Sequence, residues 1–201
     1  MSYEIVSQVE NPFKNKEQWN NFLDIADKRI QIRDTWWRKF QSEMNKSVSS
    51  VKNWGFSSVD HLNYRCYING FTRDSVCLVA GNFNNRISIG LWAPQYKYDL
   101  KKLSELLQEE KIGEPIKAKF DCLHYNNMYE SSEWKYAEYI ILDDVKEDDP
   151  LHIERMAWYA NYETAELVSL FNKKINKFRE DEEITRILTD LNNNETIIKK
   201  Q

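Results

Sequence analysis

Four basic side chains are spaced so that they could contact phosphate groups along one face of a sheet. They occupy polar positions in segments that alternate between apolar and polar residues. A row of cations beside aromatic rings is typical of a site that holds a nucleic-acid backbone and stacks its bases. Exposed strand faces are also rich in Lys and Arg for solubility and edge protection, so both interpretations stay open. The set comprises Arg65, Arg86, Lys117 and Lys119, with the rings of Tyr67 and Trp92 beside them.

A second set consists of Asp121 and, about a dozen residues later, Glu133 and Lys135, which flank Trp134. An Asp and a Glu-x-Lys on neighbouring strands resembles the active-site pattern of restriction-endonuclease-like nucleases. In that family the two carboxylates hold Mg²⁺ and the lysine helps to orient the attacking water. The resemblance implies metal-dependent phosphodiester hydrolysis, with Mg²⁺ as the cofactor. The alternative is three solvent-facing charges in a chain that is 30% charged.

Aromatic side chains outside the apolar stripe of a late helix form a third candidate. Trp158, Tyr159 and Tyr162 lie off that stripe. Such residues are candidates for a protein interface, or they pack under a neighbouring segment such as the loop at Trp54. Arg33 projects into the apolar arc of the first long helix. A charge there predicts an ion pair with a carboxylate, and an anion-binding arginine is the alternative.

Several common catalytic motifs are missing from the sequence. His61, His124 and His152 have no i, i+4 spacing, so no zinc-helix motif is present. Gly occurs only five times and never in a phosphate-binding loop, and no Gly-x-Ser-x-Gly elbow exists. These observations argue against dinucleotide enzymes, P-loop NTPases and serine hydrolases of the usual kinds. The acidic segment 143–149 does not match a calcium loop and is expected to be solvated.

Composition favours a folded domain in a reducing compartment. The 201 residues are 41% hydrophobic and 13% aromatic, which is enough for a sizeable core, and the net charge of −4 argues mildly against nucleic acid. Cys66, Cys77 and Cys122 are expected inside strands as reduced thiols. No signal peptide or membrane span is recognised, so a cytoplasmic location is expected.

The elements that must position these residues centre on residues 62–93. Ile87, Ile89, Leu91 and Ala93 alternate with polar positions and Trp92, the period of a half-buried strand. Short connections predict antiparallel pairing of strands over 62–68, 75–80 and 86–93, followed by strands over 116–123 and 133–142. Helices are expected over 16–44, 100–111, 149–178 and 184–191, and residues 192–201 are expected to fray.

These elements predict an α+β fold, in which one antiparallel sheet of about five strands is covered mainly on one face by long N- and C-terminal helices. Residues 1–178 are expected to form a single domain. Residues 179–201 would add a short amphipathic helix and a tail.

The order of elements also resembles an uncharacterised bacterial domain found alone or C-terminal to restriction-endonuclease-like domains. The resemblance rests on residues 33–37, 85–92, 100–115 and the late helix that carries Trp158. It covers about residues 27–178 and implies an accessory role near DNA defence or mobile elements, without an established reaction.

The sequence therefore favours a non-catalytic protein that binds another protein through the surface of Trp158, Tyr159 and Tyr162 or through the C-terminal helix, with a homo-oligomer left open. A metal-dependent nuclease and a nucleic-acid-binding module without catalysis are the alternatives.

Overall fold

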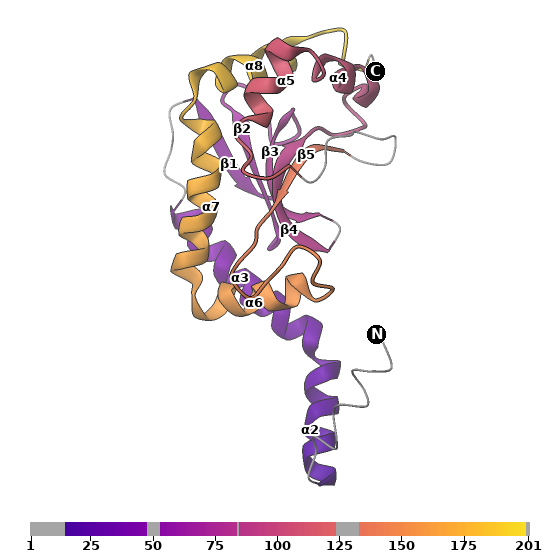
Figure 1. Cartoon of the computed structure of the whole chain (residues 1–201), viewed down its shortest axis with the longest axis vertical. Coiled ribbons are helices and arrows are strands. Elements are labelled where there is room, and N and C mark those ends of the chain that lie inside the picture. The colour runs from indigo at the N-terminus through magenta and orange to yellow at the C-terminus, as the bar shows by residue number, and fades with distance from the viewer. Residues whose placement is uncertain (1–14, 48–52, 84, 124–132, 200–201) are drawn as a thin grey trace.

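The computed structural model describes residues 15–47, 53–83, 85–123 and 133–199. Within these residues five strands form one sheet: β1 (Trp54–Ser58), β2 (Asn63–Ile68), β3 (Cys77–Phe83), β4 (Arg86–Trp92) and β5 (Trp134–Tyr139). The helices are α2 (Lys16–Asp27), α3 (Arg29–Ser47), α4 (Leu100–Leu106), α5 (Glu110–Lys117), α6 (His152–Tyr162), α7 (Thr164–Arg179) and α8 (Glu182–Asn193). The predicted α+β class is confirmed (Figure 1).

The strands pair in chain order, and every neighbouring pair is antiparallel. β3 is the middle strand, as its uninterrupted apolar sequence predicted. At the turn between β2 and β3, Gly70 has a φ of 95°, a conformation that glycine adopts without steric cost. The three strands predicted between residues 62 and 93 are therefore confirmed, with shifts of a few residues at their ends.

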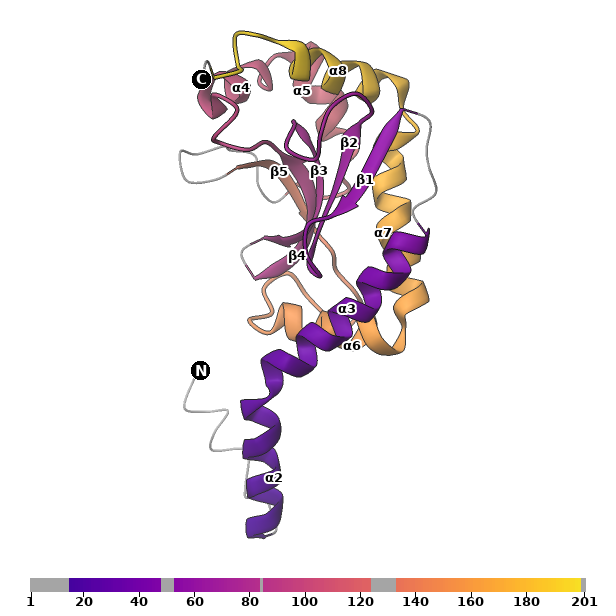
Figure 2. The ribbon, with the colours of Figure 1, turned by 180° about the vertical axis from the view of Figure 1, so that it is seen from behind.

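Helices cover one face of the sheet and its two ends (Figure 1, Figure 2). Ile87, Ile89 and Leu91 of β4 are buried in the core that these helices share with the sheet, as their alternation predicted. The predicted apolar stripe of residues 153–178 is buried in the same core. Burial of these large apolar side chains supplies most of the favourable free energy of folding.

The opposite face of the sheet carries a smaller cluster built only from strand residues. Its buried members are Cys77, Val79, Phe83, Trp92 and Ala137, and Tyr67 and Tyr139 pack against them. The described part of the chain contributes no helix residue to this cluster. Mainly one-sided helical cover, which the sequence predicted, is thus observed.

The strand expected over residues 116–123 is wrong. Residues 110–117 form α5, and turns follow it. Of the alternating apolar residues, only Ile116 and Phe120 are buried, and their spacing of four is that of a helical turn. Cys122 is exposed outside any strand, whereas Cys66 and Cys77 are buried in strands as expected. The fifth strand is instead β1, which the sequence had assigned to a connector.

The two longest predicted helices are each divided. The first breaks at Lys28, and the second at Glu163. Asn15 caps α2, since its side chain accepts from the Gln18 N–H at 2.9 Å. However, α2 buries no side chain, so the prediction that this whole helix packs on the sheet is wrong for residues 16–27. Figure 1 and Figure 2 show α2 extending away from the rest of the structure.

The segment after α8 is ordered against the domain, which contradicts the expected fraying. The amide of Asp99 donates to the Ile197 carbonyl at 2.7 Å, and Ile197 is fully buried. Asn192 is buried and hydrogen-bonds both backbone groups of Val76. The apolar residues of α8 are buried in the main core, so α8 belongs to the same folded unit.

Candidate functional site

A groove of about 360 Å³ lies where α2 and α3 meet α6. Its wall is mainly apolar, because α2 and α3 direct large aliphatic and aromatic side chains into it. Arg29, Arg33 and Glu154 are its charged residues, and the apolar lining consists of Phe22, Ile25, Ala26, Ile32, Trp36 and Ala157. An apolar concavity with a few polar groups at its border is the usual form of a binding site.

The helix that forms one side of this groove is exposed along its apolar surface. Ile25 is 62% exposed and Leu23 is 43% exposed, and Ile30 just after the break is 53% exposed. Apolar residues scattered singly over a surface are normal, but contiguous ones mark interaction sites. Ile25 lines the groove, and Leu23 and Ile30 directly follow Phe22 and Arg29, which also line it.

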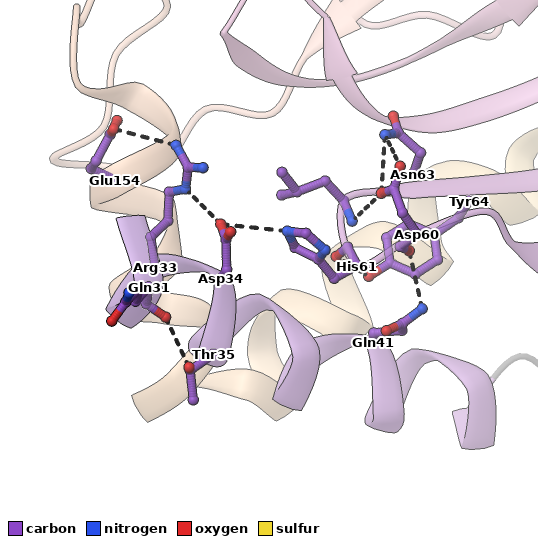
Figure 3. A network of polar contacts seen from close by, with 11 residues as sticks. Gln31, Arg33, Asp34, Thr35, Gln41, Asp60, His61, Asn63, Tyr64 and Glu154 are labelled. Atoms are coloured by element: carbon purple, nitrogen blue, oxygen red, sulfur yellow. Dashed lines mark hydrogen bonds and ion pairs between the residues drawn. The ribbon is translucent and has the colours of Figure 1, made fainter. Parts of the chain in front are cut away.

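An ion-pair network holds the border of the groove (Figure 3). Arg33 Nη1 lies 3.6 Å from Glu154 Oε1 of α6, and Arg33 Nε lies 3.0 Å from Asp34 Oδ1. The same Asp34 oxygen lies 3.4 Å from Nε2 of His61, in the turn after β1. The predicted ion pair of Arg33 with a carboxylate is confirmed, and it connects α3 to α6.

The turn between β1 and β2 is fixed against α3 by further hydrogen bonds (Figure 3). The Asp60 side chain accepts from the Leu62 N–H at 2.6 Å, and the Asp60 carbonyl accepts from Gln41 Nε2 at 3.1 Å. The Tyr64 hydroxyl donates to the His61 carbonyl at 2.9 Å. The Gln41 hydrogen bond and the contact of His61 with Asp34 tie the turn to α3, whereas the other two hydrogen bonds fix the turn internally.

Arg29 differs from Arg33 in its surroundings. Its Nε lies 3.9 Å from Glu154 Oε1, and its side chain is 59% exposed. Glu154 is shared between the two arginines, so one carboxylate faces two guanidinium groups. Arg33 is also paired with Asp34, so the positive charge that this border presents to solvent comes from Arg29.

The aromatic residues predicted as an interface adjoin the same groove. Trp158 is 43% exposed and Tyr162 is 63% exposed, with ring centroids 5.3 Å apart. Tyr162 also meets the ring of Trp36, which lines the groove, edge-on at 5.7 Å. We call Trp158 and Tyr162 the aromatic patch.

Tyr159 is less available than its two neighbours. It is half-buried, and its hydroxyl donates to Asp144 Oδ1. This hydrogen bond to a carboxylate raises the pKa of Tyr159 to about 12. Its ring packs edge-on against Trp158, at 5.1 Å between centroids. Tyr159 thus packs against the aromatic patch and is not counted as part of it.

The three residues of the nuclease hypothesis lie apart. The Asp121 N–H donates to Glu138 Oε2 at 3.0 Å, near the end of β5, whereas Glu133 precedes the start of that strand. Five residues of extended chain span about 17 Å, so the two carboxylates do not share a position. Among the residues described here, no group of three or more His, Cys, Asp or Glu side chains is arranged to hold a metal ion.

Each of these three side chains has a partner elsewhere. Asp121 pairs with Lys174 and Lys177 of α7, and these contacts lower its pKa below the ordinary value. Glu133 accepts from Trp92 Nε1 at 3.1 Å and from the Gln95 N–H at 2.7 Å. Lys135 is 2% exposed and donates to Ser104 Oγ at 2.8 Å, and burial lowers its pKa. Their roles in this structure are to connect elements.

The basic set of the nucleic-acid hypothesis is divided between two regions. Arg65 and Arg86 lie on the sheet face away from the helices, over the rings of Trp92 and Tyr139. Lys117 lies at the end of α5, 2.6 Å from Glu114 Oε1, and Lys119 pairs with Asp181. Trp92 is only 5% exposed, because the Arg65 guanidinium covers it. That ring is therefore not open for stacking with a base.

Sequence reasoning missed Arg29, Glu154, Phe22 and Ile25 as members of the site. The sequence feature that could have revealed Phe22 and Ile25 is the apolar arc of residues 16–44, which is wider than one contact with a sheet requires. The residues the sequence did select, Arg33, Trp158 and Tyr162, lie at or beside the groove.

No protein-family model matches the chain, and neither a curated protein nor a solved structure shows detectable similarity to it. The resemblance to a bacterial domain associated with restriction-endonuclease-like domains therefore stays a prediction. Among the helices in the described ranges, none combines the length and apolar character needed to cross a membrane.

Proposed function

We propose that this chain is a non-catalytic interaction protein that binds a helix of a partner chain in the groove between α2, α3 and α6. The observation that carries the proposal is the convergence of three features on one side of the structure. These are an apolar groove, two arginines at its border, and the exposed aromatic patch beside it.

The lining of the groove has the chemistry that suits an amphipathic helix, because it is mainly apolar with charged residues at its border. Such helices insert apolar residues at i, i+3 and i+4 spacing into a hydrophobic groove and leave charged residues at its border. Trp and Tyr are frequent centres of binding energy, because they bury a large area and keep a polar group for hydrogen bonding. Trp158 and Tyr162 offer both beside the groove.

Charge defines the partner further. Arg29 is exposed, and it shares the single carboxylate of Glu154 with Arg33. A partner helix with Asp or Glu along the edge of its apolar face would complement this border. The proposed partner is therefore an acidic amphipathic helix.

The test is fluorescence anisotropy with a labelled helical peptide of Leu and Glu, compared with a peptide in which Lys replaces every Glu. The Glu peptide should bind, and both Arg29→Glu and Trp158→Ala should weaken it by about tenfold or more. Lys101→Glu, an exposed charge reversal on α4, is the matched control and should leave binding unchanged. Equal binding of both peptides, or none by either, would contradict the proposal.

Trp158→Ala also separates an interface from a core role. Trp158 is 43% exposed, so its removal should cost clearly less than the roughly 3 to 5 kcal/mol that the loss of a fully buried aromatic side chain costs. A large loss of stability with unchanged peptide affinity would assign Trp158 to packing instead.

A further inference from the structure

We infer that the helix that occupies the groove is α2 of a second copy of this chain, so that the protein forms a two-fold symmetric dimer by reciprocal docking. This inference rests on the proposed function, because it names the partner of the same groove.

The two sides of α2 differ in a way that suits such an exchange. Ile25 faces the groove of its own chain. Leu23 of α2 and Ile30, just after the break at Lys28, do not line the groove, although each directly follows a residue that does. Both are exposed, at 43% and 53%. We call Leu23 and Ile30 the ridge. The chain thus presents an apolar ridge next to an apolar groove.

A chain that carries both a ridge and a matching groove can satisfy both in a single contact. In a two-fold dimer, whatever the first copy inserts into the second, the second inserts into the first. Docking the ridge of each copy in the groove of the other would bury Leu23 and Ile30 in both copies. No ridge and no groove would then stay free to bind a third copy.

The charges of α2 complement the border of the groove. Within Lys16–Asp27 the charged residues are Lys16, Glu17, Asp24 and Asp27, so the helix is net acidic. Of the charged residues that line the groove, Arg33 is paired with Asp34 and Glu154, whereas Arg29 is 59% exposed and offers a positive charge to solvent. Asp27 lies one turn after Leu23 on α2, and in the docked pair we place it against Arg29 of the other copy. Opposite charges placed this way set the register of a helix pair.

The size of the contact also favours inclusion of the aromatic patch. A stable interface buries about 800 Å² on each partner. A helix of 12 residues is about 18 Å long, and one side of it falls short of that area. Trp158 and Tyr162, next to the groove, supply further apolar surface for the end of the docked helix.

Analytical ultracentrifugation of the full chain over a range of concentrations tests the dimer. The wild type should dimerise, and Leu23→Glu should weaken the dimer by about tenfold or more, as expected when a buried anchor becomes charged. At concentrations where both proteins are monomeric, the two melting temperatures should agree, because α2 buries no side chain in the monomer. Tyr96→Glu, at a 70% exposed residue outside the groove, is the matched control and should dimerise like the wild type.

A charge exchange between copies tests the reciprocal arrangement itself. Asp27→Arg and Arg29→Glu should each weaken the dimer, and an equimolar mixture of the two variants should restore it. In the mixed dimer, one contact pairs the two introduced charges, which are opposite in sign. The other contact pairs the native Asp27 with the native Arg29. Failure of the mixture to recover would overturn the reciprocal docking of α2.

The outcomes separate this inference from the proposed function. A wild type that stays monomeric but binds the Leu and Glu peptide through Arg29 overturns the dimer and leaves the interaction protein standing. A dimer that persists in Leu23→Glu also overturns the inference. If the chain neither dimerises nor binds the peptide, both proposals fail.

Discussion

The guanidinium carbon of Arg65 lies 3.3 Å from the centroid of the Trp92 ring, on the sheet face that the helices leave uncovered. The indole N–H of the same ring, Trp92 Nε1, donates to Glu133 Oε2 at 3.1 Å. Arg65 and Glu133 therefore hold the indole from its face and from its edge. Together they close a surface that the sequence alone had suggested for base stacking.

Replacing Glu133 with Ala should destabilise the fold by about 1 to 3 kcal/mol, because Trp92 Nε1 loses its acceptor in a buried position. The Gln95 N–H, which donates to the other carboxylate oxygen at 2.7 Å, loses its acceptor as well. Urea unfolding measures the change. Glu133→Gln keeps a carbonyl acceptor and should recover part of the loss. An Ala variant as stable as the wild type would show that these hydrogen bonds contribute nothing.

His152 should make stability depend on pH. It is fully buried, its Nδ1 accepts from the Ile87 N–H at 3.3 Å, and its Nε2 lies 3.0 Å from the Ile140 carbonyl. Burial is the main cause that lowers the pKa of His152 below the ordinary value of 6.5. The unfolded chain therefore binds the proton more readily than the folded chain. The stability this residue contributes should be present above about pH 6.5 and should fall as the pH drops below it.

The measurement is the free energy of unfolding at a series of pH values between 5 and 8. His152→Leu should lower stability by about 1 to 3 kcal/mol at pH 7, because two backbone groups lose their partner. The same variant should show a smaller fall in stability below pH 6.5. If the two pH profiles run parallel, the titration of His152 is not the cause.

Gly113→Ala should destabilise the protein although the residue lies within a helix. A Cβ at this position would stand 2.0 Å from the Leu107 carbonyl oxygen, which also accepts from the Tyr136 hydroxyl at 2.8 Å. Overpacking against backbone costs about 1 to 3 kcal/mol, whereas Gly to Ala in an exposed helix gains about 1 kcal/mol. Thermal unfolding distinguishes the two. Lys111→Ala on the exposed side of α5 is the control and should change stability little; a stabilised Gly113→Ala would show that the neighbouring backbone moves freely.

Local patterns in the sequence predicted the fold class because burial and period agree in the central elements. The alternation of Ile87, Ile89 and Leu91 matches the strand that buries them, and the apolar stripe of residues 153–178 matches the core. Helix breaks were not predicted, because Lys28 and Glu163 carry no breaking signal of their own. The strand predicted over residues 116–123 was wrong because two buried positions four residues apart fit a strand and a helical turn equally well.

The candidate site was only partly predictable for a related reason. Trp158 and Tyr162 were recognisable as aromatics off the apolar stripe, and Arg33 as a charge on an apolar arc. The groove itself depends on the direction of α2 relative to α3 at the break at Lys28, which local sequence does not specify. Asp121, Glu133 and Lys135 have the right residue types for hydrolysis, but the absence of a strand over 116–123 removes the neighbouring position that would bring them together.

The hydrogen bonds of Asn192 have a consequence for synthesis on the ribosome. The Val76 N–H and carbonyl, one residue before β3, are both satisfied by a side chain 116 residues later in the chain. Domains generally fold as units as the chain emerges, and non-local contacts form late. The central strand can therefore gain its last backbone partners only after α8 has left the exit tunnel. A nascent chain stalled before that helix would expose the apolar surface that α8 covers, and it would be a natural substrate for chaperones.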